Sequence, residues 1–485
     1  MPLHLRLFLV ILGLLFFISC SSSKSQNESD VLLDTDNSEN IVDDDSDSEE
    51  DSDFIEDSDE TDDFDSDIED PEEPGEEIFE KTEPINGYKR CYDKIPAGQY
   101  EGFFADPNLE YWVKRSLNYD EDYELTEEDL LKVTKVSVYS QDIRGIEKLV
   151  NLESVKISGG NVYDYIPLLW LEKLKELKID AENMTCLDGS FSLLTNLENL
   201  EIEETKLKDV SPVEQLVNLT SLAMRSNEIE SLPENIGNLQ KLEFLSFSYN
   251  NAKDIKPLKS LINLRKLFFH SNYIEDISPV KNLVNLTKFG AQGNKIKDIS
   301  AVTNLINLTY LGLNNNQIEE IPEEIINLKK LQTLELSFNN ISNLPVLEGL
   351  NSLDTLWFSN NALNDEDFMK LNDPENVRFL DVALNKITKV PIMKNVKSLK
   401  ELYLNYNSIT DLSGFADNES FPALKSVYLG SNKISDAEAL RNRKGLNRLS
   451  IGKNCITDLS PLEELKERGT YISGMNEQLE SCGDE

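Results

Sequence analysis

The sequence predicts an α/β solenoid, in which short parallel strands line a concave face and short turns or single helical turns cover the convex side. Three observations support this fold class. A pattern of leucines and one asparagine returns about every 22 residues. Within each copy apolar and polar residues alternate, which is typical of a strand with one buried face. A helix-forming segment precedes the first copy, as a cap over the open end of a repeat array requires.

The repeat is clearest in three consecutive copies, which begin at Leu264, Leu286 and Leu308. Each copy reads LxxLxLxxNxI, which is the signature of a leucine-rich repeat. About fifteen copies lie between Val133 and Leu465. We therefore expect one horseshoe-shaped domain over residues 133–465, with the LxLx segments of successive copies paired as parallel strands.

An asparagine follows each predicted strand where the chain turns. Its amide can donate to and accept from backbone groups that the turn leaves unpaired. Stacked copies predict a buried ladder, in which one substitution would leave buried polar groups unpaired at a cost of about 1–3 kcal/mol each. We interpret these residues as structural; they are Asn227, Asn250, Asn272, Asn294, Asn316, Asn339, Asn361, Asn385, Asn407, Asn432 and Asn454.

Some copies are irregular. Two insertions, from Leu363 to Val377 and from Ser413 to Leu424, are interpreted as structural, although either is long enough to protrude as a loop. Repeats near the end of an array are often atypical. In the early copies the asparagine position holds other residues, namely Gln141, Gly160, Glu182 and Thr205.

The ends of the array are expected to carry caps. Residues 104–117 read as a helix, because Asp106 before Pro107 is a helix-start signal. Thr126 and Asp129 have the spacing of a capping box for a second helix. We predict an N-terminal cap over residues 87–132 and a C-terminal cap or tail over residues 466–485.

The N-terminus predicts export. Arg6 and the apolar run from Leu7 to Ile18 have the layout of a secretory signal. The residues Phe17-Ile18-Ser19-Cys20 resemble a bacterial lipobox, which implies removal of residues 1–19 and lipidation of Cys20. Ser21 after that cysteine resembles an outer-membrane lipoprotein. We expect anchoring to the bacterial cell envelope, at the outer membrane or cell surface; the alternative is an ordinary signal peptide with an incidental cysteine.

Residues 20–86 are predicted to form a disordered acidic tether. From Glu28 to Glu80 there is no Lys or Arg, and about 28 residues are Asp or Glu, more than half of the net charge of −43. This segment lacks the glycine turn and bidentate glutamate of a calcium loop, so only weak binding of divalent cations is expected. The acidic balance argues against a nucleic-acid partner.

Four cysteines follow Cys20 in the sequence: Cys91, Cys186, Cys455 and Cys482. An even number in an exported chain permits disulfides, and the sequence leaves three connectivities open. Pairing Cys91 with Cys186 would pin the N-terminal segment to an early repeat. Pairing Cys455 with Cys482 would pin the tail to the last repeat. No Cys/His cluster predicts a metal site.

Residues 104–152 resemble the N-terminal cap and first repeat of internalin-type bacterial leucine-rich-repeat proteins. The likeness rests on Asp106-Pro-Asn-Leu109, on Leu125-Thr-Glu-Glu-Asp-Leu130, and on the run from Ile143 to Leu152. It extends over roughly residues 95–465 and implies adhesion or recognition of a protein through the concave face. The chain departs from that family by lacking a wall-sorting motif and a following immunoglobulin-like domain, so only the binding architecture carries over.

Strand side chains other than the pattern leucines are expected to face solvent on the concave side. Aromatic rings at such positions mark interaction sites, because exposed apolar patches and Tyr or Trp hot spots dominate binding. The alternative is that some rings lean on neighbours and merely cover the sheet. The predicted partner-binding residues are Phe244, Phe268, His270, Tyr310, Trp357, Phe379, Tyr403, Tyr406 and Tyr428, with Tyr249 and Phe338 at related positions.

The early copies carry an acidic strip on the same face. Such a strip either steers a basic partner or keeps the domain soluble. Its residues are Glu176, Asp180, Glu201, Glu203 and Glu204.

The sequence contains no parts of an active site. His270 is the only histidine of the mature chain, and no nucleophile elbow or phosphate loop is present. We therefore expect no enzyme activity, no cofactor, and a monomeric surface lipoprotein that binds a protein or a glycan. The alternatives are an envelope scaffold and a regulatory subunit of an enzyme.

Overall fold

The computed structural model describes residues 79–482, apart from residues 82, 92, 93, 97–99, 101, 160, 161, 163, 183, 373 and 374. The predicted signal peptide, the lipidation site Cys20 and the acidic tether up to residue 78 lie outside the described residues. The chain divides into two units, Met1–Glu73 and Pro74–Glu485.

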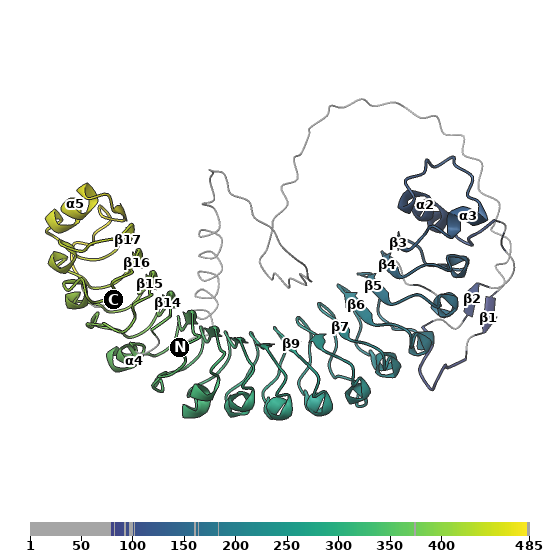
Figure 1. The fold of residues 1–485 in the computed structure, drawn as a ribbon, viewed down its shortest axis with the longest axis horizontal. Coiled ribbons are helices and arrows are strands. Elements are labelled where there is room, and N and C mark those ends of the chain that lie inside the picture. The colour runs from purple at the N-terminus through teal and green to yellow at the C-terminus, as the bar shows by residue number, and fades with distance from the viewer. Residues whose placement is uncertain are drawn as a thin grey trace. The chain divides into compact units, whose positions relative to one another are not determined.

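Sixteen described strands form one parallel sheet, in which each strand pairs with its neighbours in the sequence. The strands lie on the inner side of an arc (Figure 1). This arrangement confirms the predicted solenoid. The strands are β3 (Lys135–Val138), β4 (Ser154–Ser158), β5 (Glu176–Asp180), β6 (Asn199–Glu203), β7 (Ser221–Ala223), β8 (Phe244–Ser246), β9 (Lys266–Phe268), β10 (Lys288–Gly290), β11 (Tyr310–Gly312), β12 (Thr333–Glu335), β13 (Thr355–Trp357), β14 (Phe379–Asp381), β15 (Glu401–Tyr403), β16 (Ser426–Tyr428), β17 (Arg448–Ser450) and β18 (Tyr471–Ser473).

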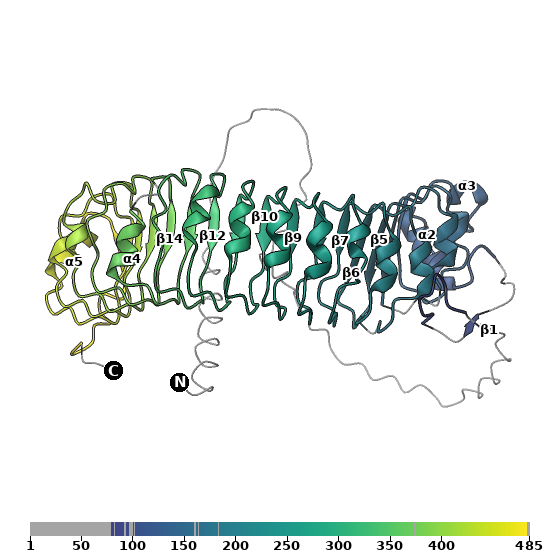
Figure 2. The same cartoon turned by 90° about the horizontal axis from the view of Figure 1, so that it is seen from below.

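Short 3-10 helices cover the convex side, where Figure 2 shows the turns side by side. Aspartates start many of them: the carboxylate of Asp276, for example, accepts from the Ser278 N–H at 2.7 Å. A proline often follows, at a position where a helix needs no N–H donor. These helices span Ile146–Lys148, Ile166–Trp170, Gly189–Leu193, Ser211–Gln215, Ile236–Asn238, Lys256–Ser260, Ser278–Asn282, Ser300–Asn304, Glu323–Asn327, Ser413–Phe415 and Glu438–Leu440.

The predicted asparagine ladder is confirmed at all eleven positions. Asn316 is representative: its Nδ2 donates to the Ala291 carbonyl at 3.0 Å, and its Oδ1 accepts from the Ile296 N–H at 3.0 Å. Each of the other ten asparagines likewise donates to a carbonyl of the preceding repeat. The ladder therefore joins each repeat to the one before it through otherwise unpaired backbone groups.

A second row of asparagines, which sequence reasoning missed, lies on the exposed flank. Asn263 Nδ2 donates to the Gln240 carbonyl at 2.7 Å, and Asn285 Nδ2 donates to the Ile262 carbonyl at 2.9 Å. Asn307 repeats this contact with the Val284 carbonyl. The sequence signal is an asparagine just before the first leucine of several copies.

The N-terminal cap contains the two predicted helices. Helix α2 (Pro107–Ser116) begins at Asp106, whose carboxylate accepts from the Asn108 N–H at 2.8 Å. Helix α3 (Glu127–Leu130) begins with the predicted capping box of Thr126 and Asp129. Hydrogen bonds from Lys132 and Thr126 hold the pKa of Asp129 well below its usual value. Leu109 and Val113 of α2 are buried and belong to the same hydrophobic core as the first strands of the parallel sheet.

A disulfide between Cys91 and Cys186 fastens the N-terminal segment to the array, with their Cα atoms 5.6 Å apart. The strands β1 (Phe79–Lys81) and β2 (Lys94–Pro96) pair as an antiparallel hairpin around this segment. The Arg90 guanidinium bonds the buried Asp188 carboxylate at 2.9 Å. Further along, the Tyr88 hydroxyl donates to Glu214 at 2.7 Å. The N-terminal segment is thus docked on the convex turns that follow β5 and β6.

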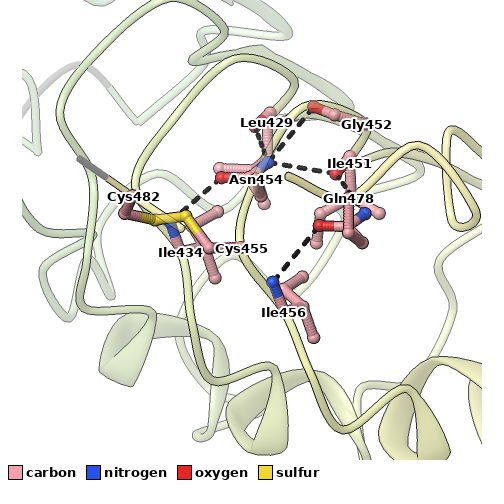
Figure 3. Close-up of a disulfide and its surroundings, with 9 residues drawn as sticks. All are labelled: Leu429, Ile434, Ile451, Gly452, Asn454, Cys455, Ile456, Gln478 and Cys482. Carbon is pink, nitrogen blue, oxygen red and sulfur yellow. Dashed lines mark hydrogen bonds between the residues drawn. A yellow bond between two sulfur atoms is a disulfide. The ribbon is translucent and has the colours of Figure 1, made fainter. Parts of the chain in front are cut away.

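The C-terminal end extends beyond the predicted boundary at residue 465. Helix α5 (Ser460–Glu467) leads into a further strand, β18, and a second disulfide joins Cys455 to Cys482 (Figure 3). Gln478 takes the place of a ladder asparagine. Its Nε2 donates to the Ile451 carbonyl at 3.1 Å, and its Oε1 accepts from the Ile456 N–H at 3.4 Å.

Both insertions pack against the core. The first contains helix α4 (Asp365–Lys370), whose Phe368 is fully buried. In the second, Phe415 and Phe421 lie 5.6 Å apart in the core. The buried Arg443 holds this second insertion through a 2.7 Å bond from Nη1 to the Ser420 carbonyl.

Candidate binding face on the concave sheet

The parallel register sorts the concave side chains into columns. In the three-residue strands the middle residue is buried, while the first and third face away from the core. Strand neighbours pair first with first and third with third, as in the pairing of Glu335 with Trp357. Side chains that are about 22 residues apart in the sequence therefore lie next to each other.

Four of the predicted residues form a continuous row of rings, which we call the ring row: Trp357, Phe379, Tyr403 and Tyr428. The ring centroids of Trp357 and Phe379 are 4.6 Å apart, and those of Phe379 and Tyr403 are 5.1 Å apart. Tyr403 and Tyr428 stack at 4.1 Å with an interplanar angle of 8°. All four are half-buried rather than fully exposed.

Arg448 closes one end of the ring row. Its guanidinium lies 5.7 Å from the ring centroid of Tyr471, the first residue of the last strand. A hydrogen bond to Tyr428 is the main cause that raises the pKa of Arg448. Burial raises the pKa of Tyr403, and the neighbouring Tyr428 raises it further. The row is thus apolar along its length and cationic at this end.

A second, smaller aromatic group contains Phe244, Phe268 and His270. The centroids of Phe244 and Phe268 are 6.2 Å apart, and those of Phe268 and His270 are 5.6 Å apart. His270 is only 9% exposed, so the expectation that it faces solvent is wrong. The cause is its neighbour Gly290, where an added Cβ would lie 2.4 Å from His270 Cε1. The glycine lets the imidazole lie flat on the sheet.

Tyr310 belongs to a polar network between these two groups. Its hydroxyl donates to Glu335 Oε2 at 3.1 Å and accepts from Gln292 Nε2 at 2.7 Å. Asn314 Nδ2 donates to the same carboxylate oxygen at 3.0 Å. Burial raises the pKa of Glu335, although all three hydrogen bonds oppose that rise.

Asp381 lies in the third-residue column between Trp357 and Tyr403. It is buried, and its Oδ1 accepts from the Ala383 N–H at 2.9 Å. Burial raises the pKa of Asp381 to about 6, because the charged carboxylate loses water without gaining a cation. Sequence reasoning missed both Asp381 and Glu335, and the available signal was a carboxylate at a strand position between aromatic neighbours.

Three other predicted aromatics do not lie on strands. Tyr249, Phe338 and Tyr406 have φ angles of 57°, 57° and 58°, which is the left-handed region. Each immediately precedes a ladder asparagine in the turn after its strand. The expectation that Tyr406 extends the strand surface is therefore wrong, and the structure places it beside the concave columns.

The predicted acidic strip is largely neutralised by cations of the same sheet. Lys178 bridges Glu176 at 3.4 Å and Glu201 at 3.1 Å. Arg225 bonds Glu203 at 2.8 Å. Lys156 lies 3.6 Å from Asp180. The strip is therefore a lattice of ion pairs rather than a field of one sign.

The described part of the chain shows neither a metal-binding cluster nor a membrane-spanning helix. No group of three or more His, Cys, Asp or Glu side chains there has the geometry to hold a metal ion. No helix within the same described residues has the length and apolar character needed to cross a membrane.

These features define a leucine-rich-repeat protein, and a family model described as a leucine-rich repeat region matches residues 284–461. The chain is 27% identical to an internalin from Listeria monocytogenes, with a TM-score of 0.54, over 76% of this chain and 95% of the other. Within this class the chain is similar to internalins.

Two further solved structures share the fold. A leucine-rich-repeat protein from Leptospira interrogans is 22% identical, with a TM-score of 0.61, over 72% of this chain and 97% of that chain. A plant peptide hormone receptor in complex with RGF2 is 19% identical, with a TM-score of 0.56, over 73% of this chain and 65% of that chain. Comparison with curated protein sequences gives no match.

Proposed function

We propose that this chain is a non-catalytic lipoprotein, exported and anchored to the bacterial envelope through Cys20, that binds a protein partner through the concave face. The ring row is the observation that carries the proposal. Half-buried aromatic rings on an open sheet offer a large apolar contact area that loses little conformational entropy on binding. Rings of this kind dominate the energetics of protein interfaces.

The packing of the ring row favours a protein over a glycan. Sugars stack on open faces of aromatic rings. Here the rings take up each other's faces, most completely where Tyr403 and Tyr428 stack at 4.1 Å. The row therefore offers mainly ring edges and an apolar ridge, which suit the side chains of a polypeptide.

The relatives support the same class of partner. The plant peptide hormone receptor of the same fold was solved in complex with RGF2. A complex on this fold agrees with a binding role for this chain. We extend this role to the ring row because it is the longest run of contacting aromatic rings on the described concave sheet.

Removal of the ring row tests this function. The triple variant Trp357→Ala, Tyr403→Ala and Tyr428→Ala is expected to lose at least tenfold in partner capture from surface extracts, with the fold retained in circular dichroism. A matched variant removes three exposed rings outside the row, by Trp170→Ala, Tyr139→Ala and Tyr273→Ala. Equal capture by both triple variants would refute the proposed binding face.

The anchor is tested separately. The Cys20→Ser variant is expected to move from the detergent phase to the aqueous phase in a phase-separation assay, because acyl chains are the proposed attachment. Protease added to whole cells distinguishes surface display from an internal envelope scaffold. Complete protection of the chain would favour the scaffold.

A further inference from the structure

Carboxylates on the concave sheet fall into two sets. In the early strands, β4 to β7, they are paired with Lys156, Lys178 and Arg225 of the same face. In β12 to β15, no described cation forms an ion pair with any of the three carboxylates on that face. These three are Glu335, Asp381 and Glu401.

The three unpaired carboxylates surround the ring row. Register places Glu335 beside Trp357, and Asp381 between Trp357 and Tyr403. Glu401 accepts from the Tyr403 hydroxyl at 3.2 Å. No strand residue from β11 to β16 is Lys or Arg. We call these carboxylates and the ring row together the acidic ring patch.

The carboxylates of the patch have already lost part of their water shell, and no described cation forms an ion pair with them in compensation. A carboxylate that leaves water without a cation is disfavoured in its charged form. Burial raises the pKa of both Glu335 and Asp381, in agreement with this cost. A ligand cation would relieve it, and the neighbouring rings would add cation–π attraction.

The ring row already accommodates a cation of its own chain. Arg448 lies at one end, where its interaction with Tyr428 raises the pKa of the guanidinium. The opposite end consists of Trp357 with Glu335 beside it, and no described cation forms an ion pair there. We propose that the acidic ring patch binds a basic segment of the partner protein and seats a Lys or Arg side chain at its Trp357–Glu335 end.

Charge excludes the chain's own N-terminal segment as the occupant. Residues 28–80 contain no Lys or Arg, so like charges would repel that segment from the patch. The inference rests on the proposed function and specifies its partner. The early strands cannot bind a basic segment equally well, because their carboxylates already form ion pairs with lysines and an arginine of the same face.

The test uses a fluorescein-labelled peptide with arginine at alternate positions, and a matched peptide with citrulline in place of arginine. The full chain is titrated at about 0.15 M salt, where charges beyond about 8 Å are screened. The patch variant carries Glu335→Gln, Asp381→Asn and Glu401→Gln. The control variant removes three charges from the paired strip, by Glu176→Gln, Glu201→Gln and Glu203→Gln.

We expect the arginine peptide to bind the wild-type chain at least tenfold more tightly than the citrulline peptide. The patch variant should lose at least tenfold in affinity, while the control variant should lose less than twofold. Equal losses would mean diffuse attraction to an acidic protein and would overturn the inference. Absence of arginine-peptide binding to the wild-type chain would overturn it as well.

The two proposals fail in distinguishable ways. If the patch variant still captures the natural partner while the ring-row variant does not, the basic segment is refuted and the concave binding face stands. Melting temperatures and circular dichroism of each variant confirm that the compared chains are folded. The three carboxamide substitutions keep the size of each side chain and one acceptor oxygen.

Discussion

Replacing Asp381 by asparagine is expected to stabilise the protein at pH 8 and to change its stability little near pH 4. The carboxylate is buried beside the ring row, and burial raises its pKa to about 6 from an ordinary value of 3.8. A shift of about 2 units corresponds to about 3 kcal/mol between the two protonation states. Asparagine removes the charge but keeps the oxygen that accepts from the Ala383 N–H.

The direction of the pH dependence follows from proton linkage. Below pH 4 both the folded and unfolded states hold the proton, so the carboxyl group costs nothing. Between about pH 4 and pH 6 the unfolded state releases its proton while the folded state retains it, and the wild-type protein loses stability. Above about pH 6 this loss is complete. The Asp381→Asn variant has no such loss.

Thermal melting at pH 4 and pH 8 measures the difference. With about 2.1 cal/mol/K of unfolding entropy per residue, 3 kcal/mol is about 3–4 °C for a cooperative unit of about 400 residues. Asp276→Asn is the control, because this exposed carboxylate also accepts one backbone N–H. A gain of equal size at both pH values, or a larger gain at pH 4, would refute the assigned cost of burial.

Three further substitutions test the packing of the array. Asn316→Leu should cost about 1–3 kcal/mol for each of two stranded backbone groups, measured as a lower urea midpoint. Gly290→Ala should cost about 1–3 kcal/mol, because its Cβ would meet His270, and a Tm equal to that of the wild-type chain would contradict the close approach. Gln478→Ala should speed hydrogen exchange at the Ile456 N–H while protection in the central repeats stays unchanged.

The repeat, the ladder and the caps were predictable because their signals are local. A leucine or asparagine recurs at a fixed spacing, and the buried face follows from alternation alone. The spacing of three residues between Thr126 and Asp129 predicted a helix start. Fold and strand positions therefore needed no knowledge of which side chains meet across the sheet.

The chemistry of the concave face depended on such lateral neighbours. Glu201 was predicted to be part of an acidic field, but Lys178 of the adjacent strand neutralises it. His270 was expected to be exposed, but the missing side chain of Gly290 on the next strand leaves space for its imidazole to pack against the sheet. Gln478 was not predicted as a ladder residue, because its side chain is one methylene longer than that of asparagine. It also does not stand in a regular copy of the repeat.

The docked N-terminal segment also determines how the array carries a load. The Cys91–Cys186 bond connects the chain before the cap directly to the turn that follows β5. A pull on the N-terminus enters the solenoid at Cys186 and runs from there toward the ring row. Residues 92–185, which include both cap helices and the first three strands of the parallel sheet, form a covalently closed loop outside that path. The N-terminal cap is thereby relieved of tension and can keep the end of the core covered while the rest of the array is pulled.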